Sequence, residues 1–199
     1  FATYQSEYPM FRISQYMREL AQAEKLGHYP AVRERSARGP VVIWNLIRRC
    51  NLTCKHCYAL SADHDYAGEL TLDEVFAVME DLKAFGVPAL ILSGGEPLLR
   101  PDIFEIAARA RAMGFYTGLS SNGTLIDRPM AERVAQAGFD YVGISLDGLQ
   151  PTHDKFRRME GAFARSLAAV RHLGACGVKV GLRFTMTALN AHDLPHLLQ

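Results

Sequence analysis

The chain has 199 residues and 49% of them are apolar, so it can bury the core of one domain. Lys and Arg (22) nearly balance Asp and Glu (21), and the net charge of +1 gives no reason to expect nucleic acid as a partner. No apolar run is long enough to cross a bilayer, and the first residues lack the basic-then-apolar order of a secretion signal. We therefore expect a cytoplasmic protein with no membrane partner.

Residues 1–39 have a mixed composition and are interpreted as an N-terminal extension. An amphipathic stretch from Met10 to about Glu24 is predicted to be a helix. The extension ends in a charged segment and the dipeptide Gly39-Pro40, which is typical of a linker. The main domain is therefore expected to cover residues 40–199.

Strands and helices alternate after Pro40. Apolar runs predict five strands, the first of them buried: Val41 to Ile47, Ala89 to Ser93, Tyr116 to Ser120, Tyr141 to Leu146 and Lys179 to Met186. Apolar residues at helical spacing predict four helices between them, over about 72–85, 101–113, 127–137 and 163–173. Thr71 and Glu74 have the spacing of a capping box at the start of the first helix.

This alternation predicts an α/β fold with a parallel sheet and right-handed crossovers. No GxGxxG motif follows a strand, so a dinucleotide-binding sheet is disfavoured relative to a full or partial (β/α) barrel. The residues from Asp193 to Gln199 resemble the start of a further helix. We therefore expect residues 40–199 to form an incomplete barrel, truncated at its C-terminal end.

Unusual polar sequences follow each predicted strand, at the end where parallel barrels collect their function. After the first strand comes a loop with Cys50, Cys54 and Cys57, in the spacing C-x3-C-x2-C. Three thiolates on one loop can converge on one metal centre, and thiolates are the usual ligands of iron–sulfur clusters. With His56 or His64, the same cysteines could instead bind a structural zinc ion. The fourth cysteine, Cys176, is distant and is expected to be a small buried residue.

Similar polar motifs end the later strands. They are Ser93-Gly-Gly-Glu-Pro97, Ser120-Ser-Asn-Gly123 and Ser145-Leu-Asp-Gly148, and Arg183 lies on the fifth predicted strand. Asn122-Gly123 could equally be a plain turn, and Arg183 in an apolar strand needs a partner that could be a ligand or a structural carboxylate. Ser145 and Asp147 are favoured as functional by their place at a strand end. The polar segment with His153, Asp154 and Arg157 is interpreted as a loop.

Together, the segment Cys50 to Cys57 and the Gly94-Gly-Glu-Pro97 motif resemble the radical S-adenosylmethionine (SAM) superfamily over about residues 40–199. The resemblance implies that Cys50, Cys54 and Cys57 hold a [4Fe-4S] cluster whose open iron binds SAM. It implies reductive cleavage of SAM to a 5′-deoxyadenosyl radical that abstracts a substrate hydrogen. By the same resemblance, the SAM-binding residues are Gly94, Gly95, Glu96 and Pro97 through their backbone, His56 against the adenine, and Asn122, Ser145 and Arg183 at the ribose or carboxylate.

Within that superfamily, the sequence is similar to the NirJ-type enzymes of dioxo-isobacteriochlorin haem biosynthesis. The similarity is carried by Gly39-Pro-Val-Val-Ile-Trp-Asn-Leu, the cysteine segment, Val142-Gly-Ile-Ser-Leu-Asp-Gly and Thr152-His-Asp-Lys-Phe-Arg157. It implies a tetrapyrrole substrate, didecarboxysirohaem, whose propionate side chains are removed, and an electron donor such as flavodoxin or ferredoxin. Arg49 and Arg157 are then candidates to bind propionate carboxylates. A peptide-maturing radical SAM enzyme and a zinc-stabilised binding module are the alternatives.

Overall fold

The computed structural model describes residues 18, 21–22, 24–25 and 39–198. The helix predicted from Met10 to about Glu24 therefore lies mostly outside the described residues. From residue 39 on, five strands form one parallel sheet in chain order. They are β1 (Val41–Asn45), β2 (Ala89–Ser93), β3 (Tyr116–Ser121), β4 (Tyr141–Ser145) and β5 (Val180–Arg183). The predicted α/β architecture is confirmed: it is a partial parallel barrel.

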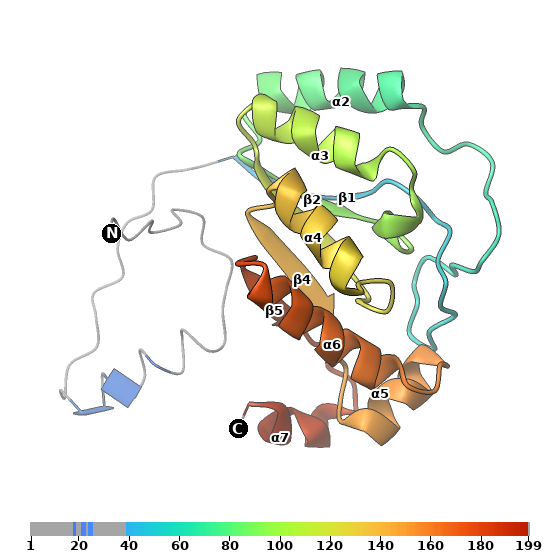
Figure 1. Cartoon of the computed structure of the whole chain (residues 1–199), viewed down its shortest axis with the longest axis vertical. Coiled ribbons are helices and arrows are strands. Elements are labelled where there is room, and N and C mark those ends of the chain that lie inside the picture. Colours follow the sequence, from blue (N-terminus) through green and yellow to red (C-terminus); the bar gives the residue numbers. More distant parts are fainter. Residues whose placement is uncertain (1–17, 19–20, 23, 26–38, 199) are drawn as a thin grey trace. The chain divides into compact units, whose positions relative to one another are not determined.

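Four helices connect successive strands and lie side by side over one face of the sheet (Figure 1). They are α2 (Leu72–Ala84), α3 (Ile103–Ala112), α4 (Arg128–Ala137) and α6 (Ala162–Ala175). Three shorter elements are the helix α5 (Gln150–Arg157) and the 3₁₀ turns η1 (Pro97–Leu99) and η2 (Ala191–Asp193), and α7 (Leu194–Leu197) follows. Every crossover thus returns on the same side, as right-handed crossovers between parallel strands in sequential order require.

The core lies between the sheet and this helix layer. Alternate strand residues, among them Leu90, Leu119 and Ile144, are fully buried against helix residues such as Met79 and Ile106. Burying each such side chain contributes roughly 1.5–3 kcal/mol relative to leaving it exposed. The resulting core fixes the sheet, and with it the positions of the loops that leave the carboxyl ends of the strands.

The local signals at the helix starts are confirmed. Thr71 and Glu74 form the predicted capping box, in which the Thr71 side chain accepts from the Glu74 amide and the Glu74 carboxylate accepts from the Thr71 amide. Asp127 caps α4 by accepting from the Met130 amide. The second helix begins at Ile103 and not at Pro101: the 3₁₀ turn η1 ends at Leu99, and Asp102 is the N-cap residue of α3.

Two strand predictions are corrected. The first strand was expected to be buried, but β1 is an edge strand whose residues alternate, and Val41 and Ile43 face away from the helix layer and are exposed. The last strand ends at Arg183 and not at Met186. Its next backbone groups are taken by side chains: the Thr185 amide donates to Asp147, and the Thr185 carbonyl accepts from Asn190. The sheet ladder therefore stops where these loop contacts begin.

Two further predictions are wrong in detail. The segment around His153 was interpreted as a loop, but it forms α5, whose first turn contains Pro151. Cys176 was expected to be buried, yet it is only partly buried at the end of α6, where its side chain packs against the core. Both errors concern short or terminal positions, where periodicity carries little information.

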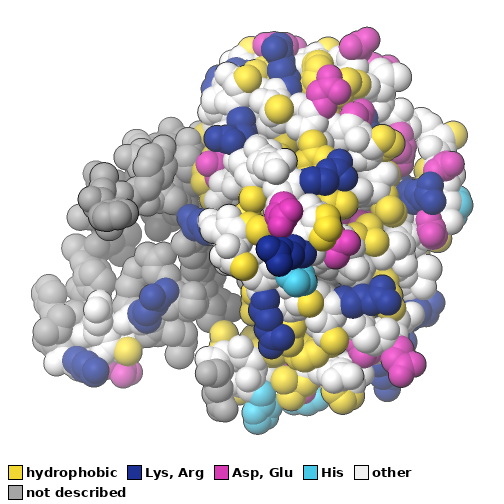
Figure 2. Space-filling model, viewed as in Figure 1, with side chains coloured by type: hydrophobic (Ala, Val, Ile, Leu, Met, Phe, Trp, Pro, Cys, Tyr) yellow, Lys and Arg dark blue, Asp and Glu magenta, His cyan; other side chains and the backbone are white. Residues whose placement is uncertain are grey.

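Basic and acidic side chains are interspersed over the helix-covered face of the protein (Figure 2), in keeping with the balanced composition. Among the helices of the described residues, none is both long and apolar enough to cross a membrane.

Candidate functional site

The three clustered cysteines lie on the loop that leaves the carboxyl end of β1. Cys50 is buried, Cys54 and Cys57 are partly buried, and none forms a disulfide. The backbone of this loop closes on itself through bonds from the Cys57 amide to the Cys54 carbonyl (3.2 Å) and from the Cys50 amide to the Ala62 carbonyl (3.1 Å). We refer to residues 48–62 as the cysteine loop.

Each of the three sulfurs lies within hydrogen-bonding distance of a donor. The Leu52 amide donates to Cys50 (3.4 Å) and the Ser61 amide to Cys57 (3.5 Å). Arg157 Nη1 donates to Cys54 Sγ (3.6 Å). Donors placed around sulfur favour the thiolate form, which is the form that binds metals.

Burial opposes that form in the free protein. It raises the pKa of Cys50 to about 11, and it also raises the pKa of Cys54, where Arg157 opposes it. The pKa of Cys57 is lowered: burial acts to raise it, but amide donors from Ser61 and neighbouring residues outweigh that effect. A bound metal deprotonates its thiol ligands outright, so this donor set suits a metal centre better than three free thiols.

Within the described residues, no three His, Cys, Asp or Glu side chains are gathered as a group that could hold a single metal ion. The ligands of one zinc ion lie at about 2.0–2.3 Å from the metal and therefore within about 4 Å of one another. A four-iron cluster is a larger body, and its thiolates stand further apart. Three thiolates leave one iron of such a cluster open, whereas the structural zinc ion that was the alternative needs a fourth protein ligand.

The turn at Gly94 and Gly95 packs directly on the cysteine loop. The Gly95 amide donates to the Ile47 carbonyl (2.6 Å), and the Glu96 amide donates to the Arg49 carbonyl (2.9 Å). A Cβ at Gly95 would lie 2.3 Å from the Arg49 carbonyl oxygen, and Gly94 has a φ of +154° that side chains rarely adopt. Only glycines therefore allow this close approach of the two backbones.

Glu96 is turned into the protein. Its carboxylate accepts from Ser121 Oγ (2.9 Å), the Asn122 amide (2.9 Å) and the Leu98 amide (3.2 Å). Burial raises the pKa of Glu96 to about 7, although these three bonds act to lower it. The side chain thus joins the loop after β2 to the loop after β3, and Pro97, which is itself buried, begins the turn η1 beside it.

Asn122 lies beside the buried cysteine. Its Nδ2 donates to Asn51 Oδ1 (3.0 Å) and contacts Cys50 Sγ (3.8 Å), while its Oδ1 accepts from the amide and hydroxyl of Thr124. The predicted residues of the first three strand ends are therefore brought together. Asn122 is more than a plain turn residue, because its side chain is buried against the cysteine loop.

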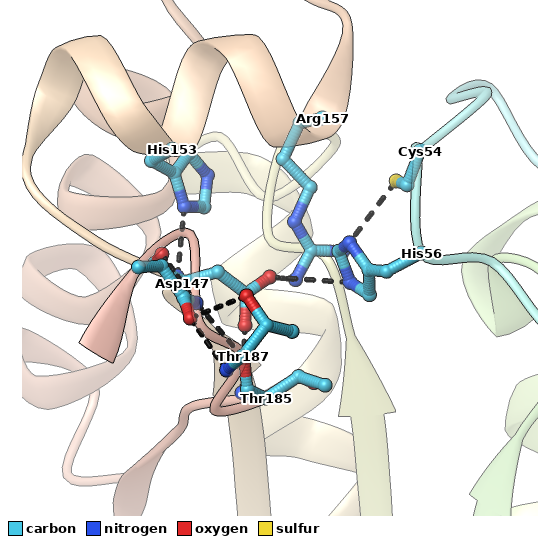
Figure 3. A network of polar contacts seen from close by, with 8 residues as sticks. Cys54, His56, Asp147, His153, Arg157, Thr185 and Thr187 are labelled. Carbon is cyan, nitrogen blue, oxygen red and sulfur yellow. Dashed lines mark hydrogen bonds and ion pairs between the residues drawn. The ribbon is translucent and has the colours of Figure 1, made fainter.

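His56, Asp147 and Arg157 form a polar network next to Cys54 (Figure 3). Asp147 is fully buried and pairs with Arg157 Nη2, and His56 Nε2 lies 3.4 Å from the same carboxylate oxygen. His56 Nδ1 is buried and has no hydrogen-bond partner among the described residues. Burial lowers the pKa of His56, so the neutral ring is favoured.

Ser145 and Arg183 are neighbours in register at the ends of β4 and β5. The Arg183 side chain crosses the sheet over Gly143, where a Cβ would lie 2.4 Å from Arg183 Nε, and Nη1 donates to Ser120 Oγ on β3. The sequence predicted that this arginine needs a ligand or a structural carboxylate as its partner. Among the described residues, its hydrogen-bond partner is a serine and not a carboxylate. Its guanidinium is held at the same carboxyl edge as the cysteine loop.

Arg49 points elsewhere. It pairs with Asp63 (2.8 Å) and Asp65 (2.9 Å), and all three side chains are substantially exposed. Hydrogen bonding to Asp63 is the main reason that the pKa of Arg49 is raised. Arg49 thus stays charged at the surface of the cysteine loop, whereas Arg157 is buried.

Sequence reasoning missed several supporting residues. Arg100 is buried, forms a bidentate pair with Asp102, and donates to the carbonyls of Leu46 and Leu70 (both 2.9 Å). It therefore ties the start of the cysteine loop to the segment that returns from it. Asn190 donates to the carbonyl of Asp147 (3.0 Å). The only local signal for either was a polar residue in an otherwise apolar surrounding.

The residues present fit both cofactors of a radical SAM site. Three cysteines with donors at each sulfur suit a cluster. Gly94 and Gly95 carry no side chain where their turn packs on the cysteine loop. His56 Nδ1, two residues after Cys54, is buried without a hydrogen-bond partner among the described residues, as expected where a bound ligand supplies the partner.

Comparison with known proteins gives a family. The Radical SAM superfamily profile matches residues 44–199. A pre-heme d1 synthase from Dinoroseobacter shibae is 53% identical over 193 residues, which cover 96% of this chain and 46% of that protein. An Fe-coproporphyrin III synthase from Methanosarcina barkeri is 49% identical over 156 residues, covering 78% of this chain and 39% of that protein.

The fold agrees. The structure of Streptococcus suis SuiB bound to S-adenosylmethionine superimposes with a TM-score of 0.68 at 18% identity, covering 93% of this chain and 41% of SuiB. The chain belongs to the radical SAM superfamily, and membership implies a [4Fe-4S] cluster and SAM as cofactors. The chain spans less than half the length of the curated relatives that it matches.

Proposed function

We propose that this chain is the radical SAM core of an enzyme that removes propionate side chains from didecarboxysirohaem during haem d1 biosynthesis. The observation that carries the substrate is the 53% identity to a pre-heme d1 synthase over 96% of the chain. The second relative, at 49% identity, is also named for a tetrapyrrole product. The first similarity extends through the cysteine loop and all five strands, because it covers 96% of the chain.

In this proposal, Cys50, Cys54 and Cys57 hold the cluster, and residues 40–199 are the catalytic core that follows an N-terminal extension. When bound, the cluster and SAM supply a one-electron cleavage that yields a hydrogen-abstracting radical. The residues proposed to bind SAM are, in chain order, His56, Gly94, Gly95, Glu96, Pro97, Asn122, Ser145 and Arg183.

The geometry supports distinct tasks for these residues. Gly94 and Gly95 bring the turn after β2 directly against the cysteine loop, so the backbone groups of this turn lie beside that loop and can bind an amino group. Glu96 acts through its backbone, because its carboxylate is engaged with Ser121 and Asn122. Arg183 offers a fixed guanidinium for a carboxylate, since Gly143 gives it room to lie flat on the sheet.

For the substrate, the proposed propionate-binding residue is Arg49. Its side chain is 39% exposed and its partners are exposed carboxylates, so a propionate can exchange for them at little cost. Arg157 was the other candidate, but two of its nitrogens are already bonded inside the protein. The proposed electron donor is flavodoxin or ferredoxin, and the proposed location is the cytoplasm, where cysteines stay reduced.

The test uses the full-length protein, purified and reconstituted without oxygen and reduced with dithionite. Deoxyadenosine and the mass of the macrocycle are followed together in the presence of didecarboxysirohaem. We expect Arg49→Ala to retain deoxyadenosine formation but to weaken tetrapyrrole binding by roughly ten- to hundredfold, equivalent to about 1.5–3 kcal/mol for a charge-assisted contact.

The matched control is Arg128→Ala, which removes an arginine from an exposed pair with Glu132 on α4. Unchanged tetrapyrrole affinity in Arg49→Ala would show that this arginine does not bind propionate. If the wild-type protein cleaves SAM but leaves the macrocycle mass unchanged, the substrate assignment fails, and a peptide substrate becomes the next to test.

A further inference from the structure

Arg157, the last residue of α5, is buried between the cysteine loop and the end of β4 (Figure 3). Its Nη1 donates to Cys54 Sγ (3.6 Å), and its Nη2 donates to Asp147 Oδ2. The third nitrogen, Nε, is buried without a partner among the described residues. The guanidinium therefore bridges the proposed cluster ligand Cys54, which is 103 positions away in the chain, and the buried carboxylate of Asp147, which is 10 positions away.

Asp147 is itself held on several sides. Its Oδ1 accepts from the Thr185 amide (2.8 Å), its own amide donates to His153 Nδ1 (3.0 Å), and its carbonyl accepts from Asn190 (3.0 Å). The first bond holds the carboxylate and the other two hold the backbone of Asp147, which has no exposed surface. The orientation of the Arg157 guanidinium follows from that of Asp147.

The cysteine loop is also fastened to α5 independently of the guanidinium. The Lys55 amide donates to the Phe156 carbonyl (2.8 Å), and the His56 ring lies against the Phe156 ring with their centroids 5.3 Å apart. Cys54 is thus fixed with respect to Arg157 from both sides of the contact. A guanidinium fixed in this way can affect the charge distribution of the Cys54 sulfur.

We propose that Arg157 is a positioning residue for the cluster, which places a permanent positive charge and an N–H donor on the Cys54 thiolate and so raises the cluster's reduction potential. The inference rests on the proposed cluster site. One-electron reduction, by an external reductant, adds one negative charge to the cluster and its thiolates and breaks no bond. A fixed cation beside a ligand sulfur stabilises the reduced state more than the oxidised state.

Arginine suits this task better than lysine or histidine. It remains protonated in any protein environment, and its planar fork can donate to a sulfur and to a carboxylate at the same time. Asp147 lies on the far side of the guanidinium from Cys54, so it weakens the field at the sulfur without reversing it. The burial of the pair keeps solvent screening low.

The experiment is a potentiometric titration of the full-length reconstituted protein, read by the EPR signal that changes when SAM is added. Arg157→Gln removes the charge, and Arg157→Lys keeps it but loses the fork. The double variant Arg157→Gln/Asp147→Asn removes both charges, so it leaves no unpaired buried carboxylate if the single variant folds poorly. Arg158→Gln, at the next and exposed position, is the matched control.

We expect Arg157→Gln to reduce the equilibrium constant for cluster reduction by about tenfold, which is a shift of about 59 mV to more negative potential. The double variant should shift in the same direction but by less, because it also removes the opposing charge of Asp147. Arg157→Lys should shift less, and Arg158→Gln should match the wild type. Midpoints of both charge-removing variants equal to that of Arg158→Gln would overturn the inference. Loss of iron from every Arg157 variant, with Arg158→Gln fully loaded, would also overturn it in favour of a purely structural role. A wild-type protein without such a cluster signal would instead refute the proposed function.

Discussion

Replacing Gly95 by alanine tests the packing of the glycine turn on the cysteine loop. The new Cβ would lie 2.3 Å from the Arg49 carbonyl oxygen and 2.4 Å from that of Arg48, both of them backbone atoms. Contacts below 3.0 Å are essentially never seen, so the two segments have to separate by roughly 0.7 Å. That movement lengthens the bonds from the Gly95 amide to Ile47 and from the Glu96 amide to Arg49.

Overpacking of this kind costs about 1–3 kcal/mol. For a chain of this size, each kcal/mol lowers the melting temperature by about 2–4 °C, so we expect a decrease of roughly 2–12 °C. The iron content after reconstitution should fall as well, because Arg49 immediately precedes Cys50. Thermal unfolding followed by circular dichroism, together with iron analysis, measures both effects.

Gly174→Ala is the matched control, because Gly174 lies inside α6 and an added Cβ would meet nothing within 4 Å. Alanine is favoured over glycine in helices by about 1 kcal/mol, so this variant should be neutral or more stable. If Gly95→Ala melts at the wild-type temperature and binds as much iron as Gly174→Ala, the two backbones are not packed as described.

Three further outcomes are expected. Burial raises the pKa of Glu96 from 4.5 to about 7, so between these pH values the folded chain binds more protons than the unfolded chain. The free energy of unfolding should therefore fall by up to roughly 3 kcal/mol as the pH rises from about 4.5 to about 7. Glu96→Gln should remove this slope in urea titrations, and a parallel pH profile would contradict it. Asp147→Asn leaves Arg157 as an unpaired buried cation and should cost about 3–5 kcal/mol by denaturant unfolding, whereas Asp63→Asn at an exposed pair should cost less than about 1 kcal/mol; equal costs would contradict the burial argument. Cys176→Ala should retain its iron, and loss of iron would place Cys176 among the ligands.

Local patterns predicted much of the fold. The capping box at Thr71 and Glu74 involves residues three positions apart, and the alternation of strands and helices repeats within short windows, so both can be read from sequence. The strand-end motifs were expected to meet because parallel strands share a carboxyl edge. The contacts between Asn122, Glu96 and the cysteine loop agree with that reasoning.

The rest depended on contacts between distant residues. The end of β5 is set by Asp147 and Asn190, whose side chains take the backbone groups of Thr185, and no periodicity records such a competition. Arg157 has its two partners 10 and 103 positions away, so the sequence alone offered only an arginine in a polar segment. Only the folded structure shows that Arg157 is buried, and this burial is the reason that it is proposed to act on the cluster and not on the substrate.

The most direct test of the central claim compares metal and sulfide in the full-length wild type and in the variant with Cys50, Cys54 and Cys57 all replaced by alanine. Both proteins are purified and reconstituted without oxygen, and deoxyadenosine formation is measured alongside. We expect the variant to lose four irons and four sulfides per chain relative to the wild type and to form no deoxyadenosine, since three thiolates hold one [4Fe-4S] cluster. Loss of a single zinc ion with no change in sulfide would contradict the account.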